Sequence, residues 1–246
     1  MLRFSGAGVS DVGLVRSGNE DSAFVGPYVA IVADGVGGAA AGEVASATAT
    51  YALAATVLSR FGELPEELLR AGAEAARASV QAGVQRDLNR LGMATTLTAV
   101  VCDGERVALG HVGDSRAYLL RDAELIQLSR DHTYVQRLVD SGQLEPGTAW
   151  HHPWRNVVLR SIDGDPLDEG IDLVPDPVVA ELLGTADAED AADALVQAAL
   201  AAGGKDNVTC VVLDVVDGPL VVGDGQLRGA VFDPANIVDP AAVRVG

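Results

Sequence analysis

The sequence predicts an α+β fold, in which helices cover an antiparallel β-sheet. Two pairs of short β-rich runs are separated by turn-forming residues, Asp103-Gly104-Glu105 and Arg121-Asp122-Ala123-Glu124, a pattern typical of β-hairpins. Residues 39–90 form two Ala-rich segments of helical character instead. Because hairpins join neighbouring strands directly, we expect antiparallel pairing and not a series of β-α-β units.

The N-terminal third predicts one hairpin and two helices. Residues 8–18 hold turn-forming residues around short apolar segments. They are followed by two apolar runs, Ser22–Val25 and Tyr28–Ala33, which are joined at Gly26-Pro27 in the pattern of a hairpin. Residues 39–60 are rich in Ala, Thr and Leu without proline, which indicates a helix packed on an apolar surface. A second helix opens at Pro65 and runs to about Arg90, since proline and acidic residues are favoured in a first helical turn.

The rest of the chain alternates between strand and helix patterns. The expected strands are 94–102, 106–112, 115–120, 125–128, 157–162, 171–174 and 206–216, and the expected helices are 133–139, 178–183 and 188–202. We divide the chain into one domain, residues 1–216, and a tail, residues 217–246, for which no element is predicted.

The composition limits the partners. The chain has 246 residues and a formal net charge of −18, which repels nucleic acid and anionic membranes. No stretch is long and apolar enough to span a bilayer, and the first residues lack a signal-peptide pattern. We therefore expect a cytoplasmic protein that binds neither nucleic acid nor membrane. The oligomeric state is left open.

One glycine-rich stretch points to a metal ion. The apolar run ending in Ala33 is followed by Asp34, by Gly35 and then by Val36-Gly37-Gly38. A carboxylate fixed at a strand end beside bare backbone suits a hard cation such as Mg²⁺ or Mn²⁺, which prefers oxygen ligands. The alternative is an aspartate that merely begins a turn after a core strand.

Other acidic residues border strands in the same way. They are Glu20-Asp21, Asp114 and Asp206. Carboxylates gathered at one rim of a sheet repel each other unless a cation lies among them. Two metal ions that share Asp34 would meet this need and would generate a nucleophile from water near neutral pH. Arg16, close in sequence to the first acids, could bind a substrate anion through its fork of donors.

These blocks resemble the metal-dependent Ser/Thr protein phosphatases, the PPM or type 2C family, in their bacterial form. The matching segments occur in the family's order: Ser10–Gly13 through Arg16 to Asn19-Glu20-Asp21, Asp34–Gly38 with Gly42–Ser46, Met93–Thr96, Val112–Arg116 and Asp206–Thr209. The resemblance spans about residues 8–216. It implies a β-sandwich flanked by helix pairs, with two Mg²⁺ or Mn²⁺ ions in a cleft at one end.

The resemblance also implies a metal-ligand set. Asp34 would bridge both metals, the Gly35 carbonyl would bind one of them, and Asp206 would bind the other. Glu20 and Asp21 would hold metal-bound waters or a metal directly.

Three further residues receive roles from the same resemblance. Arg16 would hold the phosphate, Asp114 would serve a weaker third metal, and Asn207 would support the Asp206 loop. Where some members have a histidine able to protonate the leaving group, this chain has Val36. The implied reaction is attack of activated water on phosphoserine or phosphothreonine without a phosphoenzyme. The expected partners are phosphorylated proteins, including a Ser/Thr kinase that the enzyme opposes.

The chain departs from the family at one block. A strand ending in Ser-Asp-Gly, whose aspartate is a metal ligand, is absent near residues 174–178. The expected fold therefore lacks one core strand, and Asp172 or Asp176 is a candidate substitute ligand. The alternative function is a pseudophosphatase, a phosphoprotein-binding or regulatory module without turnover.

Overall fold

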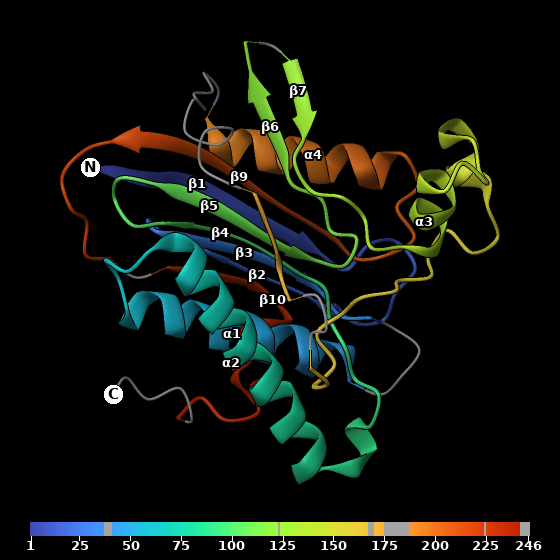
Figure 1. Cartoon of the computed structure of the whole chain (residues 1–246), viewed down its shortest axis with the longest axis horizontal. Coiled ribbons are helices and arrows are strands. Elements are labelled where there is room, and N and C mark those ends of the chain that lie inside the picture. Colours follow the sequence, from blue (N-terminus) through green and yellow to red (C-terminus); the bar gives the residue numbers. More distant parts are fainter. Residues whose placement is uncertain (37–40, 123, 167–169, 175–186, 224, 242–246) are drawn as a thin grey trace.

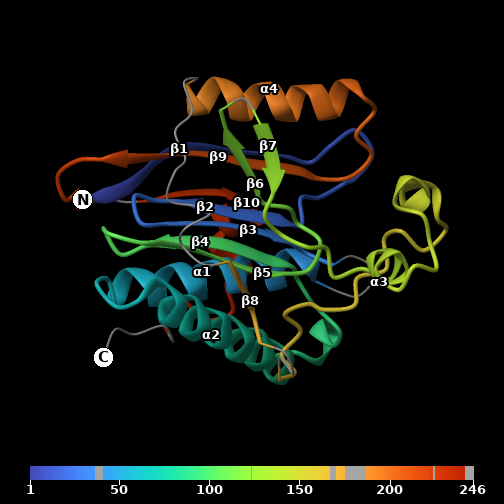
Figure 2. The same ribbon diagram turned by 45° about the horizontal axis from the view of Figure 1, so that its top comes forward.

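Two antiparallel sheets pack face to face with helices on both outer sides (Figure 1, Figure 2). The computed structural model describes residues 1–36, 41–122, 124–166, 170–174, 187–223 and 225–241. In Figure 2 the layers follow one another from α4 at the top, through the two sheets, to α1 and α2 below. This arrangement is the predicted α+β sandwich.

The larger sheet has six strands in the order β10-β2-β3-β4-β5-β8. Neighbouring strands are antiparallel throughout. Side chains of β2 to β5 are buried almost continuously, because helices cover one face and the second sheet covers the other. The strands are β10 (Gln226–Gly229), β2 (Asp21–Val25), β3 (Val29–Asp34), β4 (Leu97–Cys102), β5 (Val107–Val112) and β8 (Asp172–Val174).

The smaller sheet pairs β1 (Leu2–Asp11) with β9 (Val208–Asp217). Within the described residues neither strand has a second neighbour. The hairpin of β6 (Tyr118–Arg121) and β7 (Glu124–Gln127) forms a separate two-stranded sheet.

Of the long helices, α2 and α4 have one apolar face, whereas α1 is apolar and buried around most of its surface. Helices α1 (Gly42–Ser59) and α2 (Pro65–Arg86) cover the six-stranded sheet, and α4 (Ala188–Ala201) covers β1 and β9. The remaining helix is α3 (Tyr134–Asp140). Short 3₁₀ helices lie at Leu88–Arg90, Pro146–His151, Ala230–Phe232 and Pro234–Asn236.

The main core lies between the six-stranded sheet and the helix pair. Leu53 of α1, Leu68 and Leu69 of α2 and Leu97 of β4 are fully buried there. Burying each such side chain contributes about 1.5–3 kcal/mol. Their packing holds the strand ends, and with them the acidic residues, in fixed positions.

Several expectations need correction. Residues 2–11 form one long strand, although residues 8–18 suggest only turn formers, because pairing with β9 supplies the order that the small residues lack. Residues 157–162 do not form a strand; only isolated bridges occur, at Val158 and Ile162. In the tail, Gln226–Gly229 forms β10 at the edge of the main sheet. The helix expected at 178–183 lies outside the described residues.

The other expected elements are confirmed, with their ends shifted by a few residues. No helix among the described residues is long and apolar enough to cross a membrane.

Candidate metal centre

Four strand ends meet at one rim of the sandwich. Because β2 and β3 are antiparallel, the start of β2 lies beside the end of β3, and Asp21 is directly opposite Asp34. The start of β4 and the end of β5 lie at the same rim, since Leu97 pairs with Val112. The register therefore brings Asp21, Asp34 and the turn holding Asp114 to one edge.

The pKa values of both Asp21 and Asp34 are raised. Partial loss of water around its carboxyl group, followed by the charges of Asp21, Asp114 and Asp206, raises the pKa of Asp34, although part of this side chain stays open to solvent. Burial also raises the pKa of Asp21, while hydrogen bonds from Thr209 and Asp34 act against that rise. The directions agree with a protonated Asp34 that donates to an ionised Asp21. Without a cation, the two carboxylates cannot both stay charged at low cost.

Asp114 and Glu20 add further negative charge. Asp114 follows Gly113, whose φ of 113° is accessible mainly to glycine, and burial raises the pKa of Asp114. Burial likewise raises the pKa of Glu20, which Arg16 counteracts. Both carboxylates thus favour a nearby cation.

Arg16 and Asp206 form an ion pair at the mouth of the site. Arg16 Nη2 lies 2.9 Å from the Asp206 carboxylate, and both side chains are open to solvent. The pKa of Arg16 is raised by this hydrogen bond and by the charge of Asp206, with smaller contributions from Glu20 and Asp34. The sequence assigned these residues to different partners, a phosphate and a metal. The structure joins them to each other.

The backbone around Glu20 and Gly35 is packed without spare room. A Cβ atom on Gly35 would lie 2.5 Å from the Gly42 carbonyl oxygen and 2.8 Å from the Glu20 carbonyl oxygen. Gly35 N also donates to Glu20 O at 3.1 Å. Asn207 accepts from Glu20 N at 2.9 Å and donates to the carbonyls of Val12 and Gly18. Asn207 therefore ties the Arg16 loop to the start of β9.

Sequence reasoning missed the threonines that hold the acidic pair. Thr209 Oγ1 donates to Asp21 Oδ2 at 2.6 Å and lies 2.8 Å from Ser10 Oγ. Thr96 N and Thr95 Oγ1 donate to the Asp34 carbonyl at 2.8 and 2.9 Å. These threonines belong to blocks that mark the family resemblance, which was the signal available for finding them.

Asp172, a candidate substitute for the missing ligand, has other partners. It lies on β8 opposite His111, and two strands, β4 and β5, separate β8 from β3. Its carboxylate accepts a hydrogen bond from Arg160 at 2.9 Å and lies 3.1 Å from His132 Nε2. Burial acts to raise the pKa of Asp172, but the hydrogen bonds and charges of Arg160 and His132 outweigh it, so the pKa is lowered. Asp176 lies outside the described residues.

The donor chemistry of the rim fits a hard cation. Carboxylate and carbonyl oxygens converge there, and the upward pKa shifts of Asp21 and Asp34 show that their anionic forms lack compensation. Across the described part of the chain, no three acidic, histidine or cysteine side chains already form a closed metal cage. Binding would therefore require side chains to rearrange, and release of Asp206 from Arg16 would be one such change.

Sequence comparisons identify relatives of this chain. The sequence profile described as protein phosphatase 2C matches residues 19–165. The serine/threonine protein phosphatase PstP of Mycobacterium tuberculosis is 40% identical over 236 residues, covering 88% of this chain and 46% of PstP. The serine/threonine phosphatase stp of Listeria monocytogenes is 30% identical over 236 residues, covering 83% of this chain and 93% of the relative. The chain thus spans about half the length of PstP.

Solved structures share the fold. The crystal structure of M. tuberculosis PstP/Ppp matches with a TM-score of 0.76 and 37% identity, covering 86% of this chain and 98% of that one. The PstP catalytic domain in complex with two manganese ions matches with a TM-score of 0.77 and 36% identity, covering 88% and 100%. Since the profile match extends over more than half of its length, this chain belongs to the protein phosphatase 2C family.

Proposed function

We propose that this chain is a metal-dependent protein phosphatase that hydrolyses phosphoserine and phosphothreonine, with Mn²⁺ or Mg²⁺ as cofactor. The observation that supports it most is the facing pair of Asp21 and Asp34, whose raised pKa values indicate anions in need of a cation. The family membership and the two manganese ions in the PstP catalytic domain agree with this proposal.

The proposed ligands are the oxygens of the rim. Asp34, the Gly35 carbonyl, Asp206 and the carboxylates of Glu20 and Asp21 would hold two ions. Asp114 serves a weaker third ion. When bound, such ions offset the phosphate charge and make water a nucleophile near neutral pH.

The chain's own residues bind and orient the substrate. Arg16 turns from Asp206 to the phosphate, where its planar fork of donors matches two phosphate oxygens. Asn207 holds the Arg16 loop against the start of β2 through its three hydrogen bonds. Val36 has no proton to give, so the proton of the leaving hydroxyl comes from water or from another residue.

The proposed partners are phosphorylated proteins, among them a Ser/Thr kinase whose phosphorylation the enzyme reverses. We place the protein in the cytoplasm. The net charge of −18 favours phosphoprotein segments that are otherwise basic.

Binding of phosphoproteins without turnover is the second candidate function. It is favoured by the missing Ser-Asp-Gly block and by the engagement of Asp172 with Arg160 and His132. With one carboxylate fewer, the second ion would bind weakly and turnover would fall.

Hydrolysis of a phosphothreonine peptide by purified protein in excess Mn²⁺ tests the proposal. Release of phosphate above the level of an Asp34→Ala variant supports the phosphatase. Equal rates in both proteins, together with retained peptide binding, would establish the second candidate instead.

A further inference from the structure

The outer edge of β1 is open along its second half, except at the Gly8 carbonyl, which Arg228 occupies. In an antiparallel pair of strands, every second residue hydrogen-bonds to the partner strand. Gly218 N donates to Met1 O at 3.0 Å, so the odd-numbered residues of β1 are the ones that bond to β9. Ser5, Ala7 and Val9 therefore hydrogen-bond to β9, whereas Gly6, Gly8 and Ser10 turn their backbone groups away from it.

Three contacts agree with that assignment. Leu2 and Phe4 occupy even-numbered positions of β1, as Gly6, Gly8 and Ser10 do. Their amides donate away from β9, to Gly104 O and Pro27 O, each at 2.7 Å. The Gly8 carbonyl accepts from Arg228 Nε at 2.9 Å. Beyond Phe4, the amides of Gly6, Gly8 and Ser10 have no acceptor among the described residues.

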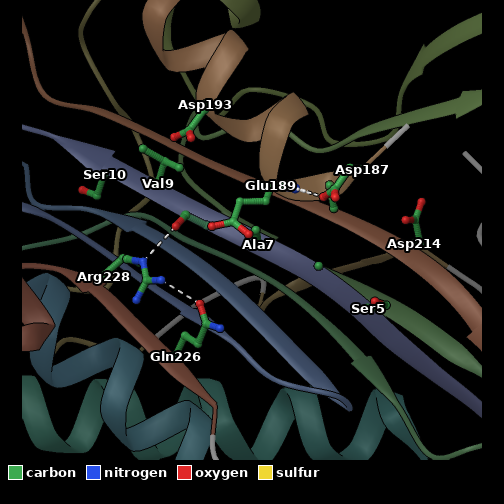
Figure 3. A pocket seen from close by; sticks show the side chains of 13 residues that line it. Ser5, Ala7, Val9, Ser10, Asp187, Glu189, Asp193, Asp214, Gln226 and Arg228 are labelled. Atoms are coloured by element: carbon green, nitrogen blue, oxygen red, sulfur yellow. Dashed lines mark hydrogen bonds between the residues drawn. The ribbon is translucent and has the colours of Figure 1, made fainter. Parts of the chain in front are cut away.

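A groove of about 680 Å³ runs along this open edge. Its floor is Ser5–Ser10, and Figure 3 shows the acidic side chains of α4 on one side of β1 and the side chains of Gln226 and Arg228 from β10 on the other. We call it the β1 groove. Its polar lining comprises Asp187, Glu189 and Asp193 at the start of α4, Asp214 of β9, and Gln226 and Arg228 of β10.

The charge in the β1 groove is strongly unbalanced. Four carboxylates face one guanidinium, and Arg228 is already engaged by Gly8 O, Leu227 O and Gln226 Oε1. Asp187 caps α4 by accepting from Glu189 N at 2.9 Å. In the described chain, no basic side chain pairs with Glu189, Asp193 or Asp214.

We propose that the β1 groove binds an extended basic segment of a partner protein, which pairs with β1 as an additional strand. Unpaired edge groups are a template for strand addition, and main-chain hydrogen bonds then supply affinity. Alternate side chains of the added strand point to the same face, so lysines or arginines at every second position would meet Glu189 and Asp193.

The groove also leads to the metal centre. Ser10, at its end, lies 2.8 Å from Thr209 Oγ1, which donates to Asp21. A segment held on β1 is thus aligned with the candidate catalytic rim. The docking proposal nevertheless concerns a separate surface and requires no metal and no phosphate.

A labelled, unphosphorylated octapeptide of alternating Lys and Val is the first probe, with the full chain in EDTA. We expect saturable binding by fluorescence anisotropy and none for the Glu-Val counterpart.

The double variant Glu189→Gln/Asp193→Asn should weaken binding roughly tenfold. The matched variant Glu67→Gln/Asp122→Asn removes the same charge from exposed positions elsewhere and should leave the dissociation constant unchanged. Equal weakening by both variants would overturn the proposal.

Backbone pairing is tested separately. Strand addition uses the amides of only every second peptide residue, so N-methylation of one alternate set should abolish binding while the other set tolerates it. Hydrogen exchange at Gly6, Gly8 and Ser10 should slow on binding. Tolerance of both methylated sets, or protection elsewhere, would refute the proposal.

A concentration-dependent dimer that competes with the peptide would also refute it, since a second copy would then be the occupant. Because these measurements exclude metal and phosphate, their failure is distinct from a failure of the phosphatase proposal.

Discussion

Asp21 and Asp34 stand opposite each other on neighbouring antiparallel strands, with the hydroxyl of Thr209 donating to one and the backbone of Thr96 holding the other. Two carboxyl groups thus occupy directly opposed positions of neighbouring strands, at the rim of the sandwich. Like charges directly opposite are destabilising in a sheet. The pair therefore costs stability in the metal-free protein, which is the expected signature of a site built for a cation.

Replacing Asp34 should stabilise the metal-free protein while ending its activity. The pKa of Asp34 is raised to about 8, so the folded state binds a proton that the unfolded state has released above about pH 4. Stability of the wild type therefore falls as pH rises from 4 to 8, and Asp34→Asn removes that loss. Because solvent reaches Asp34, we expect a gain of about 1 kcal/mol, or a melting temperature higher by roughly 2–4 °C.

Thermal melts in EDTA at pH 5 and pH 8.5 measure this effect. The difference between Asp34→Asn and wild type should be larger at pH 8.5. Excess Mn²⁺ should raise the melting temperature of the wild type only. A variant less stable than wild type at pH 8.5 would contradict the account.

Removing Arg16 should separate substrate binding from metal binding. Arg16→Ala frees Asp206 from its ion pair, so Mn²⁺ should bind at least as tightly as in wild type. The same variant loses the guanidinium proposed for the phosphate, so KM for a phosphothreonine peptide should rise roughly tenfold. Titrations with Mn²⁺ and steady-state kinetics provide the two readouts. Weaker Mn²⁺ binding in Arg16→Ala would show that the ion pair does not compete with metal.

Thr209 should act as a positioning residue for Asp21. Thr209→Val keeps the shape of the side chain but removes the hydroxyl that donates to Asp21 Oδ2. Loss of such an outer hydrogen bond typically lowers metal affinity about 10–100-fold. Thr209→Ser retains the hydroxyl and should restore most of the affinity. If Mn²⁺ titrations gave the same value for both variants, the hydroxyl would have no part in holding Asp21.

Gly35 should tolerate no side chain. The Cβ atom of Gly35→Ala would meet two backbone carbonyl oxygens within 2.8 Å, so the chain must shift at a cost of about 1–3 kcal/mol. Gly147→Ala is a matched control, since nothing lies within 4 Å of its Cβ position. Denaturant unfolding should show a lower midpoint for Gly35→Ala only. Equal midpoints would mean that the Gly35 turn is looser than described.

The sequence predicted the hairpins and the long helices because their signals are local. Turn residues at 103–105 and 121–124, and Pro65 with its acids, mark boundaries without reference to the rest of the fold. The candidate acids could be named for the same reason, since each borders an apolar run.

Long-range pairing could not be predicted. Residues 2–11 and 226–229 become strands only through β9 and β2, which are distant in sequence. The Arg16–Asp206 ion pair joins residues 190 positions apart, and Thr209 meets Asp21 across 188 positions. Residue spacing along the chain cannot predict contacts between residues so far apart. The only indication of them in the sequence was that these residues belong to the segments resembling the family.

The most direct test is the initial rate of aryl phosphate hydrolysis as a function of Mn²⁺ concentration. It compares wild type with Asp34→Ala, Asp206→Ala and the exposed control Asp122→Asn. We predict a saturable Mn²⁺-dependent rate in wild type and Asp122→Asn, and its loss in Asp34→Ala and Asp206→Ala. A wild-type rate equal to that of Asp34→Ala at every Mn²⁺ concentration would contradict the phosphatase account.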